Sequence, residues 1–561
     1  MGVKVTPGGF AAPGTAMGFR TGTWRIQRPE HVHGIAPCHH ACLAGEDPQA
    51  WIASLAEGDV AGAWQRLIAA NPLPASTGRV CPHPCETACN RGGYDAPLNV
   101  HGLERWLGDA ALAAGWACPA PAIGRDVPAV AVVGAGPAGL SCAWQLLRRG
   151  IRPVLLEALN QAGGVPRTAI PPYRLPRAVL DGEIERLLAT GIEFRPHQRL
   201  GRDFSLEELE TDFAAVFLAV GTQKSRPYSV EGVVPRDLRF GLDLLRHWIA
   251  EGAVPVMDSV AIIGGGNTAV DVARILKRAG VREVHLITHE RMPHAQVPDY
   301  ERMRAAPDEI VQALEEGVLI HENRMVRRLI LRGERVVGVE IVHARKLKEG
   351  ERVRVQAFEG TESVLKVDQV IPAIGQVVNE EGLAQLLGQR EFLRVEADGR
   401  VPGTSRIFAG GDCRPGLGTV AGAIFDGARA AAAIADLLGR HETRPQRGAV
   451  VGLDRLNLHY FDHAPRQEPP VLPVSERAGD REVQGGLDQQ AAHAEALRCF
   501  SCGNCMACDN CFTLCPDNAV LKTRAPLTDG SHYVFDYDYC KGCGLCAHEC
   551  PVGYIAMVEE E

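Results

Sequence analysis

The segment Val130-Ala-Val-Val-Gly134-Ala-Gly136-Pro-Ala-Gly139 decides the fold of this chain, because it joins a short apolar run to a G-x-G-x-x-G turn. A second copy, Val260-Ala-Ile-Ile-Gly264-Gly-Gly266-Asn-Thr-Ala269, has alanine in the third glycine position. Such glycines permit a tight turn and let backbone N–H groups approach a pyrophosphate at a helix N-terminus. Two copies, each between an apolar run and an amphipathic segment, predict two dinucleotide sites on parallel α/β sheets. The residues expected to bind there are Gly134, Gly136, Pro137, Ala138, Gly139, Gly264, Gly266, Asn267, Thr268 and Ala269.

Two later segments complete the first site. Residues 151–157 read as a strand that ends in Glu157, a carboxylate placed to bond ribose hydroxyls. Residues 407–412 read as another strand, which ends in Gly411-Asp412. In flavoproteins that bind two nucleotides, such a segment returns the chain to the FAD domain, and its aspartate bonds the ribityl chain of the flavin. The helix expected next carries further candidate residues, namely Thr419, Val420 and Ala423.

The cysteines predict metal chemistry, because ten of the 18 lie between Cys499 and Cys550. Two runs in the tail have the bacterial ferredoxin spacing C-x2-C-x2-C-x3-C-P, in which the fourth cysteine of each run crosses to the other cluster. One 4Fe–4S cluster is therefore expected on Cys505, Cys508, Cys511 and Cys550, and a second on Cys540, Cys543, Cys546 and Cys515. A zinc ribbon is the alternative. Cys499 and Cys502 continue the spacing upstream, have no assigned ligand role and are expected to be structural.

Composition and charge narrow the class of protein. A chain of 561 residues with 46% hydrophobic and 23% charged residues is expected to form three to four globular domains. Its net charge of −9 argues against a nucleic-acid or membrane partner. Because residues 1–25 lack a basic start followed by an apolar run, we expect a cytoplasmic protein, in which thiols stay reduced. Residues 499–561 hold nine acidic side chains against three basic ones, which predicts a face that docks a protein partner.

Together these motifs resemble the small subunit of glutamate synthase and its relatives. The resemblance extends to Cys81-Pro-His-Pro-Cys85-Glu-Thr-Ala-Cys89 and to Gly163-Gly164 with Ile170-Pro-Pro-Tyr-Arg174. It implies an α/β protein with two Rossmann-like domains, in which the NAD domain is inserted in the FAD domain behind an N-terminal helical Fe–S domain. Gly164 and Arg174 would then belong to the cofactor site. The α+β ferredoxin-like tail is absent from the ordinary subunit and is similar to fused electron-transfer subunits of 2-oxoacid:acceptor oxidoreductases, such as those for 2-oxoglutarate or phenylglyoxylate.

The resemblance also divides the chain. The expected parts are a helical Fe–S domain (1–125), the first part of the FAD domain (126–223), an NAD(H) domain (224–369), the second part of the FAD domain (370–440), a linker (441–497) and a ferredoxin domain (498–561).

The N-terminal cysteines are spaced less regularly than those of the tail. Relatives with two clusters here carry a further Cys-x2-Cys before the position of Cys38, where this chain has Glu30 and His33. One N-terminal cluster is therefore expected. By resemblance it would use Cys42, Cys81, Cys85 and Glu104. Because carboxylate ligation is unusual, Cys38 or Cys89 could replace Glu104.

The end of the strand at residues 284–288 bears on the choice of nicotinamide cofactor. NADPH-using relatives place an arginine pair there, whereas this chain has Glu290 followed by Arg291. A carboxylate accepts a hydrogen bond from a free 2′-hydroxyl and repels a phosphate, so NAD(H) is expected. Arg291 could still turn inward.

These motifs predict a redox enzyme subunit. FAD would exchange hydride with NAD(H) and pass single electrons through 4Fe–4S clusters to a partner subunit of an oxidoreductase complex, with no side chain acting as acid or base. The alternatives are a glutamate-synthase-type NADPH subunit that feeds an amidotransferase partner, and a non-catalytic relay or assembly subunit.

Overall fold

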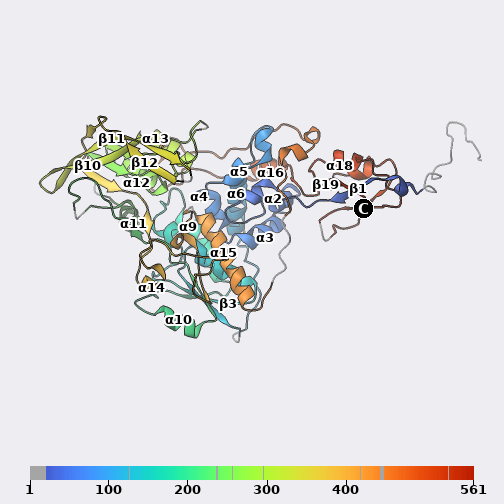
Figure 1. Cartoon of the computed structure of the whole chain (residues 1–561), viewed down its shortest axis with the longest axis horizontal. Coiled ribbons are helices and arrows are strands. Elements are labelled where there is room, and N and C mark those ends of the chain that lie inside the picture. The colour runs from blue at the N-terminus through green and yellow to red at the C-terminus, as the bar shows by residue number, and fades with distance from the viewer. Residues whose placement is uncertain are drawn as a thin grey trace, which may run out of the picture.

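The computed structural model describes residues 20–124, 127–235, 238–254, 257–294, 296–350, 352–416, 418–441, 448–527 and 530–560. The first nineteen residues of the predicted helical domain and its predicted boundary at 125–126 lie outside these ranges. In Figure 1 the second α/β unit lies at one end of the molecule and the cysteine-rich tail at the other, with the first α/β unit and the N-terminal helices between them.

The first sheet is parallel throughout, in the order β16-β5-β2-β3-β4. Its central strands are apolar and buried, as a parallel sheet covered by helices on both faces requires. Helices α7 and α15 pack closely against each other beside this sheet. The bounds are β2 (Ala129–Val133), α7 (Pro137–Arg148), β3 (Arg152–Leu156), β4 (Glu193–Arg195), β5 (Ala215–Leu218), β16 (Ile407–Ala409) and α15 (Val420–Leu437).

The second sheet is also parallel, in the order β14-β7-β8-β9, and the chain builds it between β5 and β16 of the first sheet. This confirms the predicted insertion of one α/β unit in the other. An antiparallel sheet, β10 to β13, is inserted between β9 and β14 of this second sheet. The bounds are α11 (Gly241–Glu251), β7 (Ser259–Ile263), α12 (Asn267–Arg278), β8 (Glu283–Ile287), α13 (Pro307–Glu315), β9 (Leu319–His321), β10 (Arg324–Arg332), β11 (Arg335–Glu349), β12 (Arg352–Ala357), β13 (Ser363–Leu365) and β14 (Gln369–Pro372).

The N-terminal region is helical, as predicted. Asp47 and Asp59 cap α2 and α3 with side-chain hydrogen bonds, and Trp51 and Leu67 bury the facing sides of these two helices. A helix from the other end of the chain, α16, packs on α2 and α6. The bounds are α1 (Pro37–Ala41), α2 (Pro48–Ala56), α3 (Val60–Ala70), α4 (Pro74–Val80), α5 (Pro84–Thr87), α6 (Val100–Ala113) and α16 (Gln489–Leu497).

The tail is completed by a strand from the N-terminus. Strand β1 pairs antiparallel with β19 along its whole length (Figure 1), and the Arg25 Nε atom lies 2.6 Å from the Glu560 carboxylate. The sequence patterns did not reveal this pairing of the two ends of the chain. The bounds are β1 (Gln27–His31), α17 (Asn510–Thr513), β17 (Val520–Lys522), β18 (Tyr533–Phe535), α18 (Leu545–His548) and β19 (Ile555–Glu559).

The described part of the predicted linker, residues 448–497, is held against the rest of the protein. The Arg466 guanidinium donates to Glu86 of α5 at 2.8 Å, and Arg477 donates to Glu315 of α13 at 2.7 Å. The backbone N–H of Val483 bonds the carbonyl of Tyr173 at 3.1 Å. This segment, which we call the strap, therefore contacts the helical region and both α/β units.

The remaining elements are short or peripheral. They are η2 (Thr21–Trp24), η3 (Asn90–Gly93), α8 (Gly164–Thr168), α9 (Arg177–Leu188), α10 (Leu206–Asp212), β6 (Lys224–Ser225), β15 (Gln376–Val377), α14 (Ala384–Leu387), η4 (Gly411–Cys413), η5 (Leu453–Arg455), η6 (Leu458–Tyr460) and η7 (Val474–Glu476).

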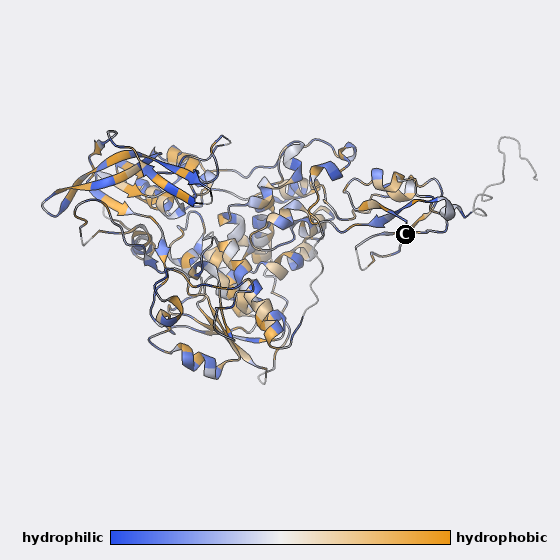
Figure 2. Cartoon of the chain, in the orientation of Figure 1, coloured by the Kyte–Doolittle hydropathy of each residue, from blue (hydrophilic) through white to orange (hydrophobic). Residues whose placement is uncertain are grey.

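Hydropathy follows this architecture. Figure 2 shows hydrophobic residues gathered in α15, while the strands of β10–β12 alternate between hydrophobic and hydrophilic residues. Among the described residues, none of the helices combines the length and the apolar character that crossing a bilayer requires.

Candidate cofactor sites

The first glycine-rich turn connects β2 to α7. Gly134 has φ of +105°, and a side chain there would overlap the carbonyl oxygen of Ala219, so only glycine fits. Helix α7 begins after Gly136 without a side-chain cap. The backbone N–H groups of its first turn are therefore free of side-chain caps and available to an anion such as a pyrophosphate.

Glu157 follows β3 and lies against this turn. Its carboxylate accepts hydrogen bonds from the backbone N–H of Ala135 at 2.7 Å and of Leu159 at 2.9 Å. The side chain is mostly buried. These contacts fix a carboxylate at the end of the second strand, the position from which ribose hydroxyls are bound.

The return segment lies on the same turn. A Cβ at Gly411 would stand 2.9 Å from the Cβ of Ala138, so η4 and the start of α7 are in close approach. Burial raises the pKa of Asp412 to about 6, and nearby Asp426 raises it as well. Asp426 is occupied by the backbone N–H of Gly411 at 2.9 Å. Asp412 is thus the carboxylate that this segment presents to the neighbouring cavity.

A cavity of about 1100 Å³ joins these parts and reaches the second turn. Its size matches or exceeds the roughly 300–1000 Å³ of ordinary small-molecule sites, as a dinucleotide requires. Gly139, Gly264, Gly266, Ala269 and Glu290 do not line it. The predicted residues that do are Gly134, Gly136, Pro137, Ala138, Glu157, Gly164, Arg174, Asn267, Thr268, Gly411, Asp412, Thr419, Val420 and Ala423.

The second glycine-rich turn repeats the geometry of the first. Gly264 has φ of +139°, and a side chain there would overlap the carbonyl oxygen of Ala373. Helix α12 begins after Gly266, again without a side-chain cap. This turn can therefore receive a second pyrophosphate in the same way.

Glu290 lies beside the second turn, where a Cβ on Gly265 would overlap its carboxylate. The Lys346 Nζ atom of β11 donates to it at 2.6 Å, and both side chains are largely buried. Arg291 faces Glu301 at 3.5 Å rather than the turn. Lys346 was missed by the sequence reasoning, because no local pattern connects it to a residue 56 positions away.

Arg174 lies between the two α/β units. Its guanidinium donates to Asp271 of α12 at 2.8 Å and lies 3.0 Å from Glu309 of α13. Arg174 and Asp271 are almost fully buried. Removing either partner of such a buried pair leaves an uncompensated charge and destabilises the folded protein. Arg174 therefore holds the second nucleotide turn in a fixed position relative to the first.

The helical region brings together four of the predicted N-terminal ligands. Cys42 ends α1, Cys81 ends α4, Cys85 lies in α5 and Glu104 in α6. Burial raises the pKa of Cys85 well above its ordinary value, and Cys42, Cys81 and Glu104 are among the neighbours that raise it as well.

Glu104 is enclosed by polar groups that the sequence did not reveal. Asn71 donates to it at 3.0 Å and also donates to Glu46 at 2.7 Å, while the Thr77 hydroxyl donates to Glu104. Burial raises the pKa of Glu104 well above its ordinary value and that of Glu46 to about 7. Glu46 has no motif or spacing that would have identified it beforehand.

Cys38 and Cys89, the two alternatives to Glu104, lie elsewhere. They are neighbours of Cys499 and Cys502, which the chain brings from the start of the tail.

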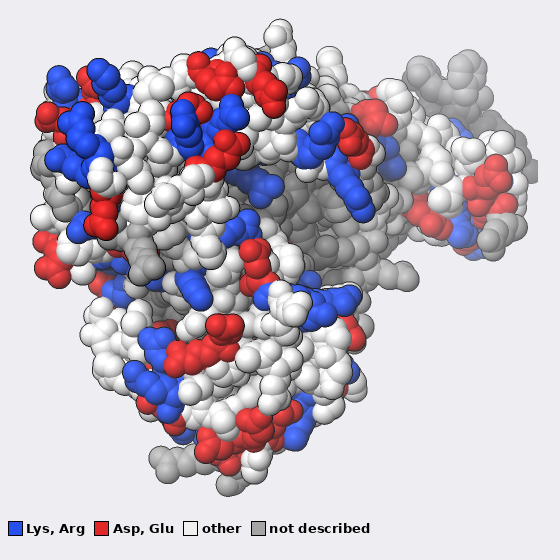
Figure 3. Space-filling model, turned by 60° about the vertical axis from the view of Figure 1, so that its left-hand side comes forward, with Lys and Arg blue, Asp and Glu red and all other residues white. Residues whose placement is uncertain are grey.

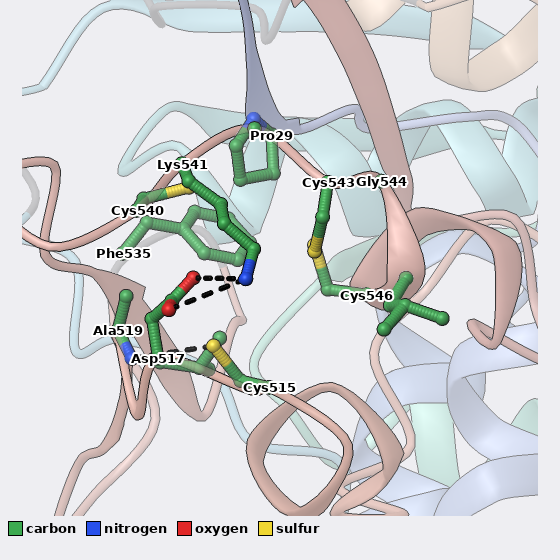
Figure 4. A pocket seen from close by; sticks show the side chains of 13 residues that line it. Pro29, Cys515, Asp517, Ala519, Phe535, Cys540, Lys541, Cys543, Gly544 and Cys546 are labelled. Atoms are coloured by element: carbon green, nitrogen blue, oxygen red, sulfur yellow. Dashed lines mark hydrogen bonds and ion pairs between the residues drawn. The ribbon is translucent and has the colours of Figure 1, made fainter. Parts of the chain in front are cut away.

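The structure brings together each of the two predicted tail sets. Figure 4 shows Cys515, Cys540, Cys543 and Cys546 around one space, and the Lys541 Nζ atom lies 3.3 Å from Asp517 beside it. In the other set, burial raises the pKa of Cys511 to about 12, and the three other thiols of the set are among the neighbours that raise it as well. These thiols belong to Cys508, Cys505 and Cys550.

The donors fit iron–sulfur clusters better than single ions. Among the described residues, no three His, Cys, Asp or Glu side chains surround a point that could hold one metal ion. All 18 cysteines are free of disulfides. Because a four-iron cluster is larger than one ion, its thiolate ligands stand further apart while remaining neighbours, which is the arrangement of both tail sets.

Three parts of the chain match known families. Residues 128–427 match the family described as Pyridine nucleotide-disulphide oxidoreductase. Residues 33–116 match the one described as Dihydropyrimidine dehydrogenase domain II, 4Fe-4S cluster, and residues 504–554 match the 4Fe-4S dicluster domain.

Whole proteins match as well. The chain is 35% identical over 516 residues to the NADP(+)-dependent formate dehydrogenase subunit beta of Moorella thermoacetica, with 83% of this chain and 70% of that protein covered. It is 32% identical over 534 residues to the NADPH-Fe(3+) oxidoreductase subunit beta of Geobacter sulfurreducens, with 85% and 77% covered. It is also 32% identical over 428 residues to the NADPH glutamate synthase small chain of Mycobacterium tuberculosis, with 72% and 85% covered. The chain therefore belongs to the pyridine nucleotide-disulphide oxidoreductase family and carries 4Fe–4S domains on both sides of the nucleotide-binding region.

Proposed function

We propose that this chain is the NAD(H)-linked electron-transfer subunit of an oxidoreductase complex. The observation that carries the proposal is the single cavity that reaches both glycine-rich turns, because a flavin held by one turn and a nicotinamide held by the other can meet in it. A bound flavin supplies the exchange of hydride with nicotinamide and of single electrons with iron–sulfur clusters.

The residues around the cavity have separate tasks in this proposal. Glu157 and Asp412 bind the ribose and the ribityl hydroxyls of FAD, and the uncapped starts of α7 and α12 bind the two pyrophosphates. Arg174, paired with Asp271, keeps the two halves in register. None of these side chains donates or removes a proton in the reaction.

Three clusters belong to the proposal as the sequence predicted them. Two are held by the tail sets, each of four thiolates, and the third by Cys42, Cys81, Cys85 and Glu104. Asn71 and Thr77 orient the carboxylate of Glu104 toward the thiols, in the manner of outer-shell groups at other metal sites.

Glu290 is proposed to select NAD(H). The diol of an adenosine ribose can donate to its carboxylate, whereas a 2′-phosphate would have to displace that carboxylate from Lys346. The Glu290→Gln variant should bind NADPH more tightly relative to NADH. The matched control is Glu283→Gln, which changes a half-exposed glutamate at the start of β8, the strand that precedes Glu290.

The proposed partner is another protein of the complex that docks at the tail. The acidity of the tail is partly offset, because Arg20 and Arg25 of the N-terminal segment pair with Asp538 and Glu560. Figure 3 likewise shows acidic and basic side chains interspersed over the face in view. The ferredoxin-like tail favours a 2-oxoacid:acceptor oxidoreductase, and the 35% identity to a formate dehydrogenase subunit favours a formate-oxidising enzyme as the second candidate.

Anaerobic titration of the purified chain with NADH and with NADPH tests the proposal. We expect NADH to bleach the flavin absorbance at lower concentration than NADPH. No bleaching by either nucleotide would contradict an electron-transfer role, and bleaching by NADPH alone would contradict the role of Glu290. Co-purification then identifies the partner through its own cofactor.

A further inference from the structure

Of the seven cysteines outside the three proposed clusters, four lie together. Cys38 and Cys89 come from the helical region, and Cys499 and Cys502 come from the start of the tail. Burial raises the pKa of the Cys38 thiol well above its ordinary value, and three neighbouring thiols raise it as well. These thiols belong to Cys499, Cys89 and Cys502.

Hydrogen bonds join the two ends of the chain around these thiols. The Asn90 side chain, next to Cys89, donates to the Cys502 sulfur at 3.4 Å and to the Val451 carbonyl of the strap at 2.9 Å. The Gln49 side chain donates to the Ser501 hydroxyl at 2.6 Å. The place of Cys499 and Cys502 beside the helical region is therefore fixed by specific contacts.

A basic side chain lies beside these thiols. The Arg91 guanidinium lies 4.9 Å from the centre of the Phe500 ring and donates to the Arg498 carbonyl. Arg91 is also among the charged neighbours of Cys499. Cys499 also accepts a hydrogen bond from the Ser501 N–H at 3.4 Å, a contact that stabilises a sulfur ligand.

The arrangement excludes two simpler roles for the four thiols. None of them is in a disulfide. Nor do they belong to a group of described side chains that could hold a single metal ion, such as tetrahedral zinc. The thiols of the two ferredoxin-spaced tail sets show the same arrangement: they are neighbours, but they stand too far apart to bind one ion. We propose that Cys38, Cys89, Cys499 and Cys502 hold a fourth 4Fe–4S cluster.

This site lies between the other clusters along the chain. Cys38 lies in the short helix α1 and Cys42 directly follows it, while Cys502 lies three residues before Cys505 of the first tail set. The fourth cluster would therefore adjoin the N-terminal cluster on one side and the tail on the other. That the fourth cluster passes single electrons between the N-terminal cluster and the tail clusters rests on the proposed function. That the four cysteines hold a cluster does not rest on it.

Iron analysis of the reconstituted full chain tests the site. Four clusters of four irons give about sixteen irons per chain, and three give about twelve. We expect about sixteen in the wild type and about twelve in the double variant Cys499→Ser/Cys502→Ser. Cys118→Ala, which removes a similarly buried thiol outside all four sets, should keep about sixteen. The single variant Cys89→Ser changes the opposite segment and should lose the same cluster if the double variant fails to fold.

A wild-type content of about twelve irons, or of about one zinc in place of the missing iron, would overturn the fourth cluster. An unchanged iron content in both the double variant and Cys89→Ser would do the same. Flavin bleaching by NADH, measured on the same samples, reports on the proposed function separately, because none of these cysteines lines the nucleotide cavity.

Discussion

The tail cysteines and the N-terminal cysteines differ in how far apart in the chain their partners lie. Each tail set comes from residues 505–550, whereas the N-terminal region combines residues 38–104 with Cys499 and Cys502. A ligand set that one short module folds around itself leaves a readable spacing in the sequence. A set assembled from opposite ends of a chain leaves none, and only the packing of the strap and α16 on the helices reveals it.

The two regions are also held together by different forces. In the helical region, Glu495 of α16 accepts the backbone N–H of Asn99 at 2.7 Å, and both side chains are fully buried. In the tail, the ion pair of Lys522 with Asp509 is half-exposed. A substitution in the helical region should therefore also affect the segments packed on it, such as α16. A substitution in the tail should affect the tail alone.

The largest expected effect follows from Cys546→Ser in the tail. Loss of one ligand from a self-contained set should remove about four irons per chain and stop electron delivery through the tail. Reduction of the flavin by NADH should be unchanged. Iron analysis and electron paramagnetic resonance of the reduced protein measure both, with Cys118→Ser as the control. Loss of the flavin or of the N-terminal cluster as well would show that the tail is not an independent module.

The next effect concerns Glu104, the proposed carboxylate ligand in the helical region. Glu104→Ala should weaken retention of the N-terminal cluster, and Thr77→Val should weaken it by a smaller factor, about 10- to 100-fold, as removal of an outer-shell group does. Glu104→Cys should retain iron, because it supplies a fourth thiolate. Equal iron in Glu104→Ala and wild type would remove Glu104 from the ligand set.

Much of the nucleotide-binding fold could be predicted, because its signals are local. The strand, the glycine-rich turn and the helix follow one another directly at both Gly134 and Gly264, and the apolar strands β2 and β7 are of the kind that a parallel sheet buries. The pairing of β1 with β19 and the contact of Lys346 with Glu290 could not be predicted. Each joins residues far apart in the chain, and the sequence around them contains no motif that connects the two.

An intermediate effect concerns pH, and the two regions should respond in opposite directions. Burial raises the pKa of Glu183, which accepts backbone hydrogen bonds at the start of α4, from 4.5 to about 7. Glu183 belongs to α9 and binds the helical region from there, so the folded protein holds this proton more tightly than the unfolded chain. Its contribution to stability is present below pH 4.5 and is lost, by at most about 3 kcal/mol, as pH rises to about 7.

Thermal unfolding midpoints measured across this interval should fall with pH, and Glu183→Gln should flatten the slope. Part of the pH dependence should persist in this variant, because the pKa of Glu46 is raised to about 7 as well. In the tail, hydrogen bonds from Lys522 and Arg25 lower the pKa values of Asp509 and Glu560, so those contributions are lost as pH falls. A slope that Glu183→Gln leaves unaltered would assign the pH response to another buried acid.

The smallest expected effect comes from Lys522→Ala, which removes a half-exposed ion pair of the tail. Exposed pairs contribute little and are screened by salt, so the iron content should stay at the wild-type value and the shift in the unfolding midpoint should shrink further in high salt. Loss of a tail cluster in this variant would show that surface charge, rather than the cysteine frame, holds the tail together.

In the proposed electron path, electrons pass from the nucleotide cavity to the tail through a cluster whose cysteines come from both ends of the chain. Rapid mixing with NADH, followed by flavin absorbance and freeze-quench paramagnetic resonance, tests it most directly on the wild type and on Cys499→Ser/Cys502→Ser. We expect equal rates of flavin bleaching in the two proteins, with tail-cluster signals that develop in the wild type and are delayed or missing in the variant. Tail signals that appear at the same rate in both proteins would contradict it.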